Sequence, residues 1–187
     1  DSDDFIRNQV LIEAPDAQGQ FSRSLAFRLA EKFRGEEAKV ENGRLLWGGR
    51  AIPSTAERTI TINYSGPTET YPWISLVDFI EAARAGNKEQ IRKWVAGKVV
   101  MLGPDNIEDR HPTPFYTSFS GQKYNTAGVE IHANTLHTLL DGDYIVPVSN
   151  TIRILALALV ALIPAAVSAS LAAPRTAYWM TAAIGAT

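Results

Sequence analysis

The hydrophobic positions of this chain follow two different patterns on either side of residue 150. Up to that residue, short apolar runs alternate with polar stretches and with breaks rich in glycine and proline. Beyond it, residues 154–173 include no charged side chain. The first pattern is typical of a water-soluble domain with mixed secondary structure. The second is typical of a helix that is long enough to span a membrane.

Several stretches of the first part predict β-strands. Residues 59–64 alternate with a period of two and are rich in β-branched side chains, and residues 7–12 hold three consecutive aliphatic side chains. Residues 44–53 predict a hairpin, because Gly48 and Gly49 both tolerate the positive φ of a two-residue turn.

Helix-capping residues mark where the helices of the first part begin and end. One helix is expected to begin after Ser22 or Ser24 and to end at Gly35. A second begins after Ser75, and Asn87 can cap a third, shorter one. The first two predicted helices each carry an apolar stripe at helical spacing, as expected for helices packed on a core.

Residues 97–103 form a continuous apolar run bounded by glycines. Such a run is the signature of a strand buried on both faces, and therefore of a central strand in a parallel or mixed sheet. A long loop at 104–127 is expected to follow it. The alternation of strands and helices predicts an α/β domain with a mixed or largely parallel sheet and flanking helices, followed by transmembrane α-helices.

A helix is expected from Gly128, with an apolar stripe formed by Val129, Ala133, Leu136 and Leu140. Glu130, Asn134 and His137 then fall on one polar face, at positions i, i+4 and i+7. His132 points away from Glu130, and Glu130 with His137 supplies two ligands where zinc needs three or four. We therefore predict no metal site here.

The apolar segment beyond residue 150 predicts one complete membrane span at 151–174 and the beginning of a second at 175–187. Membrane helices tolerate an interior proline such as Pro164, and Tyr178 and Trp179 occupy the place of an interfacial aromatic belt. Residues 1–150 then form the soluble domain, and the chain is expected to be a piece of a longer protein. The alternative is a soluble α/β enzyme in which the apolar tail is a buried helical hairpin.

Composition excludes several classes of function. The formal net charge is −2 and basic residues are scattered, so we expect no nucleic-acid partner. The absence of cysteine excludes disulfides and cysteine-based metal sites or nucleophiles. No nucleophile elbow or phosphate-binding glycine loop occurs, so neither a catalytic residue nor a cofactor is predicted.

Seven stretches, taken in order and spacing, resemble the second type of cyclase/histidine-kinase-associated sensing extracellular (CHASE) domain. They are residues 4–7, 24–26, 62–67, 75–78, 97–103, 113–115 and 128–134. The resemblance implies a bacterial receptor with an extracytoplasmic sensory domain at 1–150, spans in the inner cell membrane, and a cytoplasmic output domain. That output is expected to be a class III adenylate or guanylate cyclase working as a homodimer, with an unknown stimulus. The alternatives are a histidine or serine/threonine kinase output, or an interaction module without a ligand.

Two groups of residues are candidates for binding that stimulus. The loop after the apolar run holds Asp105, Asp109, Arg110 and His111, which offer both charges and one imidazole that titrates near neutral pH. The alternative is a solvated loop held by its own ion pairs. The second group is Glu130, His132 and Asn134. The alternative is that Glu130 and His132 tie the helix start to backbone groups of a loop.

Overall fold

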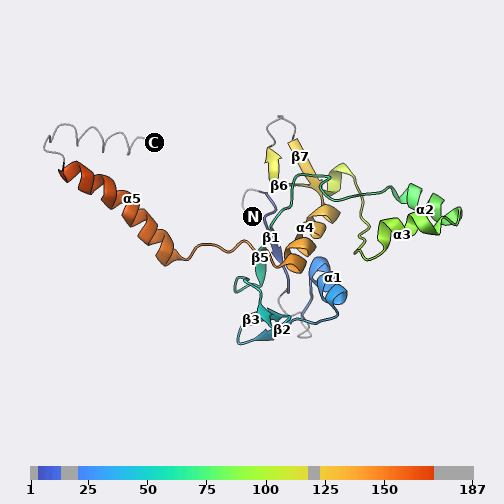
Figure 1. Ribbon diagram of the computed structural model, residues 1–187, viewed down its shortest axis with the longest axis horizontal. Coiled ribbons are helices and arrows are strands. Elements are labelled where there is room, and N and C mark those ends of the chain that lie inside the picture. The colour runs from blue at the N-terminus through green and yellow to red at the C-terminus, as the bar shows by residue number, and fades with distance from the viewer. Residues whose placement is uncertain (1–3, 14–20, 118–122, 171–187) are drawn as a thin grey trace. The chain divides into compact units, whose positions relative to one another are not determined.

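The computed structural model describes residues 4–13, 21–117 and 123–170 of the chain (Figure 1). The chain divides into two compact units, Asp1–Ile145 and Val146–Thr187. The boundary lies close to the division after residue 150 that hydropathy predicts. The predicted second span at 175–187 lies outside the described residues.

The strands in the described part of the first unit form three small sheets, and each of their pairs is antiparallel. The sheets are β1 (Asn8–Val10) with β5 (Thr59–Thr61); β2 (Lys39–Glu41), β3 (Arg44–Trp47) and β4 (Arg50–Ala51); and β6 (Arg110–Thr117) with β7 (Lys123–Ala127). The hairpin predicted at Gly48 and Gly49 is confirmed, since these residues join β3 to β4 with φ of 56° and 73°.

The helices of the first unit begin and end close to the predicted caps. They are α1 (Leu25–Arg34), α2 (Leu76–Arg84), α3 (Lys88–Val95) and α4 (Gly128–Asp141), with a short 3₁₀ helix at Ile107–Asp109. Gly35 closes α1 in the left-handed conformation. The side chains of Ser75 and Asn87 accept hydrogen bonds from the backbone N–H groups of Val77 and Gln90, as N-caps do.

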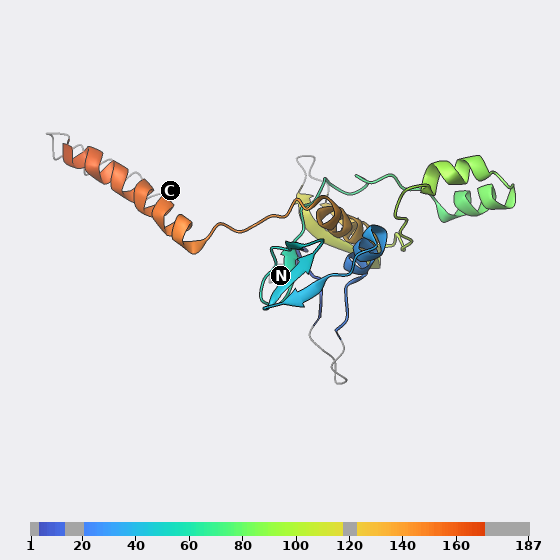
Figure 2. The same ribbon diagram turned by 60° about the horizontal axis from the view of Figure 1, so that its bottom comes forward.

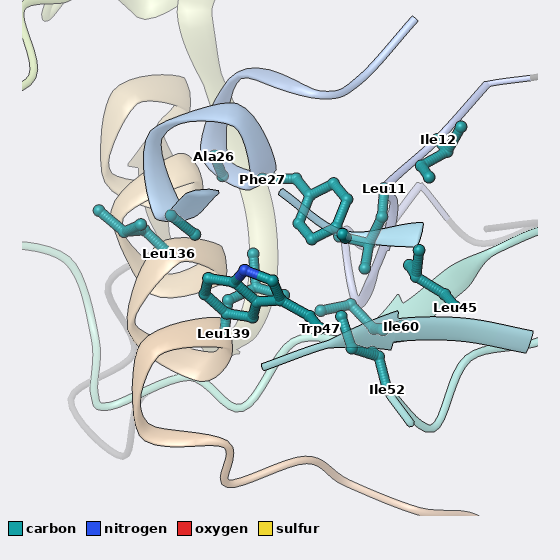
Figure 3. Packing of buried hydrophobic residues seen from close by; sticks show 12 residues of the cluster. Leu11, Ile12, Ala26, Phe27, Leu45, Trp47, Ile52, Ile60, Leu136 and Leu139 are labelled. Atoms are coloured by element: carbon teal, nitrogen blue, oxygen red, sulfur yellow. The ribbon is translucent and has the colours of Figure 1, made fainter. Parts of the chain in front are cut away.

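The hydrophobic core lies where α1 and α4 meet β3, β5 and the residues Leu11 and Ile12 that follow β1 (Figure 3). Figure 2 shows α1 and α4 side by side. Phe27 of α1 is fully buried and meets the edge of Trp47 on β3, with ring centroids 6.2 Å apart and planes at 74°. Leu136 and Leu139 of α4 complete the cluster from the other side. This core holds α4 in place, and α4 carries the candidate site.

The prediction of a mixed or largely parallel sheet is wrong. The strands are short, two to eight residues, and tight turns connect β2, β3 and β4. Such turns reverse the chain and pair neighbours in antiparallel fashion, whereas parallel pairing needs a long crossover.

Residues 97–103 do not form the predicted central strand. Val99 and Met101 pack against the core, while Val100 and Leu102 are 58% and 77% exposed. The run is therefore an extended segment with one buried face. Gly103 comes so close to α4 that a Cβ placed on it would lie 2.6 Å from Cβ of Val129. The predicted loop at 104–127 is also wrong, since it contains the 3₁₀ helix and the β6–β7 pair.

The helix α5 (Asn150–Ser170) is the helix of the second unit, whose described part runs from residue 146 to residue 170. Its segment Asn150–Val167 is long and apolar enough to cross a membrane, and no residue of that segment is buried. Large apolar side chains are exposed all along it, including Leu155, Leu159 and Ile163. A helix that is apolar on every side is expected inside a large core or inside a bilayer.

Candidate functional site

The segment 63–71 lies along one side of α4 and is held there by polar side chains of the helix. The backbone N–H of Asn63 donates to Oγ1 of Thr138, and the backbone N–H of Ser65 donates to Oδ1 of Asn134, both over 3.0 Å. Further along, the same segment reaches Glu130. Thr138, Asn134 and Glu130 are spaced four residues apart, so they form one face of the helix.

Glu130 binds the far end of this segment. Its carboxylate accepts hydrogen bonds from the backbone N–H groups of Glu69 and Thr70, both at 3.0 Å, and from the hydroxyl of Thr68 at 3.2 Å. The interpretation that Glu130 ties the helix start to backbone groups of a loop is therefore realised in the structure. These three hydrogen bonds use most of the acceptor capacity of the Glu130 carboxylate.

Replacing Glu130 by glutamine is expected to lower the free energy of unfolding by about 1–2 kcal/mol, because an amide puts a donor where two N–H groups need acceptors. Urea titration of the chain in detergent micelles measures this. Glu81→Gln, an exposed position on α2, is the matched control and should change stability by less than about 0.5 kcal/mol. Equal effects at the two positions would contradict the anchoring role of Glu130.

Asn134 is 1% exposed and uses both ends of its amide. Oδ1 accepts from the backbone N–H of Ser65 at 3.0 Å and from the hydroxyl of Tyr71 at 3.2 Å, and Nδ2 donates to the carbonyl of Glu130 at 2.9 Å. A buried amide satisfied in this way holds two segments of the chain in register. Its role in this structure is to position Ser65 and Tyr71.

His137 lies at the centre of a polar group that we call the His137 cluster, made of Ser65, Tyr71, Asn134, His137 and Asp141. Nδ1 of His137 lies 2.9 Å from both the Ser65 and the Tyr71 hydroxyl oxygens, and Nε2 lies 2.6 Å from Oδ2 of Asp141. With Nδ1 as the acceptor, Nε2 carries the hydrogen and donates to Asp141. The imidazole is thereby held in one orientation between two segments.

Burial raises the pKa of Tyr71, an effect opposed by its hydrogen bond with Ser65 and reinforced by the charges of Glu130 and Asp141. Burial also raises the pKa of Tyr64, whose hydroxyl donates to the carbonyl of Ile6 over 2.9 Å. Both phenols therefore stay protonated at neutral pH and can donate, Tyr71 within the His137 cluster and Tyr64 to the Ile6 carbonyl.

The order hydroxyl, imidazole, carboxylate is also that of a serine hydrolase triad. Here, however, the backbone N–H of Ser65 is engaged by Asn134, and the Tyr71 hydroxyl oxygen lies as close to Nδ1 of His137 as the Ser65 hydroxyl oxygen does. A nucleophilic serine needs that imidazole nitrogen and donors for an oxyanion. The geometry therefore favours binding over acyl transfer.

The predicted loop residues form ion pairs among themselves. Nε of Arg110 donates to Oδ1 of Asp105 over 3.1 Å, and Nε2 of His111 lies 3.7 Å from Oδ1 of Asp109. This arrangement matches the interpretation of the loop as held by its own ion pairs. Binding by these residues stays a prediction.

His132 faces a different hollow, of about 360 Å³, between α1, α4 and the segment after Val99. Its lining is mostly apolar: Leu25, Leu29, Val100, Met101, Leu102, Gly103, Pro104, Gly128 and Val129, with Asp109 and His132 as the titratable groups. Nδ1 of His132 is buried and has no hydrogen-bond partner among the described residues. Burial lowers the pKa of His132, and the negative charge of Asp109 partly opposes that shift.

The lowered pKa of His132 predicts a loss of stability in acid. The unfolded chain binds a proton near pH 6.5, and the folded chain binds it only at lower pH. The free energy of unfolding should therefore fall as the pH drops from 7.5 through 6.5 and below. Urea midpoints across this range measure the effect. His132→Gln should flatten this part of the profile, and an unchanged slope in that variant would contradict the assignment.

The structure thus divides the seven predicted binding residues. Glu130 and Asn134 lie together on the α4 face, Asp109 and His132 share the apolar hollow, and the others pair within their loop. Residues of the His137 cluster outside the predicted set are Ser65, Tyr71, His137 and Asp141. Helical spacing places His137 on the correct face of α4, whereas nothing in the sequence pairs Ser65 or Tyr71 with it. No group of three or more metal-ligating side chains occurs in the part of the chain that the structure describes.

Comparison with known proteins adds one decisive finding: the family model of the CHASE2 domain matches residues 1–167. This chain belongs to the CHASE2 family. CHASE2 domains are extracellular sensory domains of signalling receptors, so the resemblance noted in the sequence is confirmed and the chain has a sensory role. The match extends from the first unit into α5. Comparisons with curated proteins and with solved structures find no match.

Proposed function

We propose that residues 1–150 are the extracytoplasmic sensor of a bacterial membrane receptor whose cytoplasmic output is a class III adenylate cyclase. In this proposal α5 spans the inner cell membrane, and the receptor works as a homodimer. The observation that carries it is the CHASE2 match, which continues into a helix long and apolar enough to cross a membrane.

The proposed signal needs two arrangements of the sensor with different affinity for the stimulus. The polar face of α4 supports such a pair, because Glu130, Asn134 and Thr138 bind the segment 63–71 through hydrogen bonds that can be exchanged for ligand or water. The C-terminal end of α4 at Asp141 leads directly into the chain that continues to α5. A stimulus that changes how this segment sits on α4 would reach the membrane by that route.

The test is the cyclase activity of the membrane-embedded full-length parent, with and without residues 1–150. We expect cyclic AMP to form and its rate to change when the sensor is deleted. Formation of cyclic AMP at an unchanged rate would leave the domain without a regulatory role. No cyclic nucleotide in either protein would overturn the cyclase output and favour a kinase output or an interaction module.

The orientation in the membrane has a separate test that uses the absence of cysteine from this chain. Ala56→Cys places one thiol at an exposed turn of the first unit. In spheroplasts the thiol should react with a membrane-impermeant maleimide before the membrane is opened. Labelling only after detergent treatment would place the domain in the cytoplasm, and recovery of the chain in the soluble fraction would favour a soluble protein.

A further inference from the structure

Residues 99–103 form an extended segment whose backbone is unpaired, and we call this segment the 99–103 edge. Within the described part of the chain, none of these residues makes a backbone–backbone hydrogen bond. Gly103 consists of backbone alone and is exposed, so the main chain here is accessible. An extended segment with free N–H and C=O groups is a template for pairing with another strand.

The side chains of the 99–103 edge divide between two faces. Val99 and Met101 pack against the core, whereas Val100 and Leu102 are exposed. Natural edge strands are commonly protected from pairing by charged side chains. Residues 99–104 include none. The edge therefore presents aliphatic side chains and free backbone groups together, and both favour the addition of a strand.

The apolar hollow of about 360 Å³ that His132 faces lies beside this edge. Residues 100–104 line it, together with Leu25 and Leu29 of α1 and Val129 of α4. When a strand is added to an edge, main-chain hydrogen bonds supply affinity and pockets receive alternate side chains. The edge and the hollow are the two parts of such a site. The lining favours aliphatic side chains, because a charged one would lose its hydration there.

We propose that the 99–103 edge pairs with the same segment of a second copy of this chain, antiparallel and about a two-fold axis at Met101. In an interface of this symmetry the same surface of each copy contacts the other. Val100 then lies opposite Leu102 of the second copy, and Leu102 lies opposite Val100 of the second copy. The exposed aliphatic side chains cover one another as cross-strand pairs, which stabilise a sheet.

The charges at the two ends of the edge favour the antiparallel arrangement. Lys98 precedes the edge, and Asp105 follows it after Pro104. In the antiparallel pair each Lys98 lies near Asp105 of the second copy, and the two Lys98 side chains lie at opposite ends. A parallel pair in the same register would place the two lysines together, and like charges facing each other are destabilising.

This interface deepens the proposed function and rests on it. In that proposal α5 anchors each copy in the membrane, and confinement to one bilayer raises the effective concentration of the second copy. A short strand pair can then form, although it would be marginal between free domains in water. A Cβ placed on Gly103 would lie 2.6 Å from Cβ of Val129, so the interface adjoins α4, the helix that carries the candidate site.

The experiment uses single cysteines, because the chain has none. The chain 1–187 is reconstituted at low density in phosphatidylcholine vesicles and oxidised with copper phenanthroline, and dimers are measured on non-reducing gels. Met101→Cys places the thiol on the proposed axis. Val77→Cys, at a residue that is 61% exposed on α2, is the control for random collision. An equal mixture of Val100→Cys and Leu102→Cys chains tests the register.

We expect Met101→Cys to cross-link about tenfold faster than Val77→Cys. The mixed chains should cross-link at least about threefold more than either does alone, because residues 100 and 102 face each other only in this antiparallel register. In the Met101→Cys chain, Val100→Lys should lower the yield about tenfold, since a charge on an edge opposes pairing. Val77→Lys should change it by less than about twofold. Val100 is 58% exposed, so its substitution leaves the core intact.

Cross-linking of Met101→Cys at the level of Val77→Cys, or undiminished by Val100→Lys, would overturn the proposal. Protection of Val100→Cys from a maleimide without any cross-link would assign the edge to a different strand and overturn it as well. A dimer trapped only by Leu159→Cys in α5 would leave the homodimer of the proposed function standing and refute this interface. The measurement contains no output domain, so failure of the cyclase proposal would leave the interface standing.

Discussion

Replacing Phe27 by alanine should lower the free energy of unfolding by about 3–5 kcal/mol, the typical cost of emptying an aromatic site in a packed core. Phe27 is fully buried and meets the edge of Trp47 on β3. Leu136 and Leu139 of α4 belong to the same cluster (Figure 3). The loss of free energy has two parts: the apolar surface that is no longer buried, and a cavity that the surrounding helices and strands cannot fill.

The measurement is a urea titration of the whole chain in detergent micelles, followed by near-ultraviolet circular dichroism. Phe33→Ala is the matched control, because Phe33 lies on the same helix and is 54% exposed. That variant should lose less than about 1 kcal/mol. Similar losses in the two variants would mean that the face of α1 turned to the core is not the one in the structure. They would also remove the basis for the placement of α4.

Helices could be predicted from the sequence because their signals are local. Gly35, Ser75 and Asn87 each act through backbone groups within a few residues, and each occupies its predicted cap. Ser24 also stands at the predicted N-cap of α1, although its hydroxyl makes no capping hydrogen bond. The Gly48–Gly49 turn is equally local. Such signals involve only neighbouring residues, so they can be identified without knowledge of the rest of the fold.

Strand pairing could not be predicted because it depends on distant partners. The run at 97–103 is apolar at every central position, which suggests burial on two faces. In the structure its residues alternate, with Val99 and Met101 inward and Val100 and Leu102 outward. A continuous apolar run does not show which of its faces will be covered. The same lack of long-range information led to the wrong parallel sheet.

The candidate site shows the same division. Helical spacing alone places Glu130, Asn134 and His137 on one face of α4, and the structure brings all three to the segment 63–71. The partners on that segment, such as Ser65, lie about seventy residues away in sequence. No local sequence pattern links these residues to α4, so the His137 cluster that they form could be found only in the folded chain. The sequence therefore predicts the site residues that share a face of α4, but not the residues that reach them through tertiary contacts.

Glu31 is a buried carboxylate on α1 that contacts three groups between residues 23 and 38. It is 2% exposed. The backbone N–H of Ala38 donates to Oε1 over 2.7 Å, Nη1 of Arg28 donates to Oε2 over 3.2 Å, and Nε of Arg23 lies 3.3 Å from Oε1. The carboxylate thereby holds the connection between α1 and β2 against α1, because Ala38 immediately precedes β2.

Replacing Glu31 by alanine should lower the free energy of unfolding by about 2–4 kcal/mol. The change leaves the Ala38 N–H without its acceptor and two guanidinium groups without their buried counter-charge. The cost is below that of a fully buried pair, because the Arg23 and Arg28 side chains are 29% and 44% exposed and can turn to water. Glu31→Gln keeps one acceptor oxygen and should lose less.

The matched control is Glu37→Ala. Glu37 pairs with the same Arg28 at 3.3 Å, but its side chain is 70% exposed. An exposed ion pair is screened by water, so this loss should stay below about 1 kcal/mol. The two glutamates share an arginine and differ in burial and in the Ala38 contact. A large loss in Glu31→Ala alone would assign the stabilisation to the buried acceptor, whereas equal losses would assign it to the charge of Arg28 and contradict the packing of Glu31.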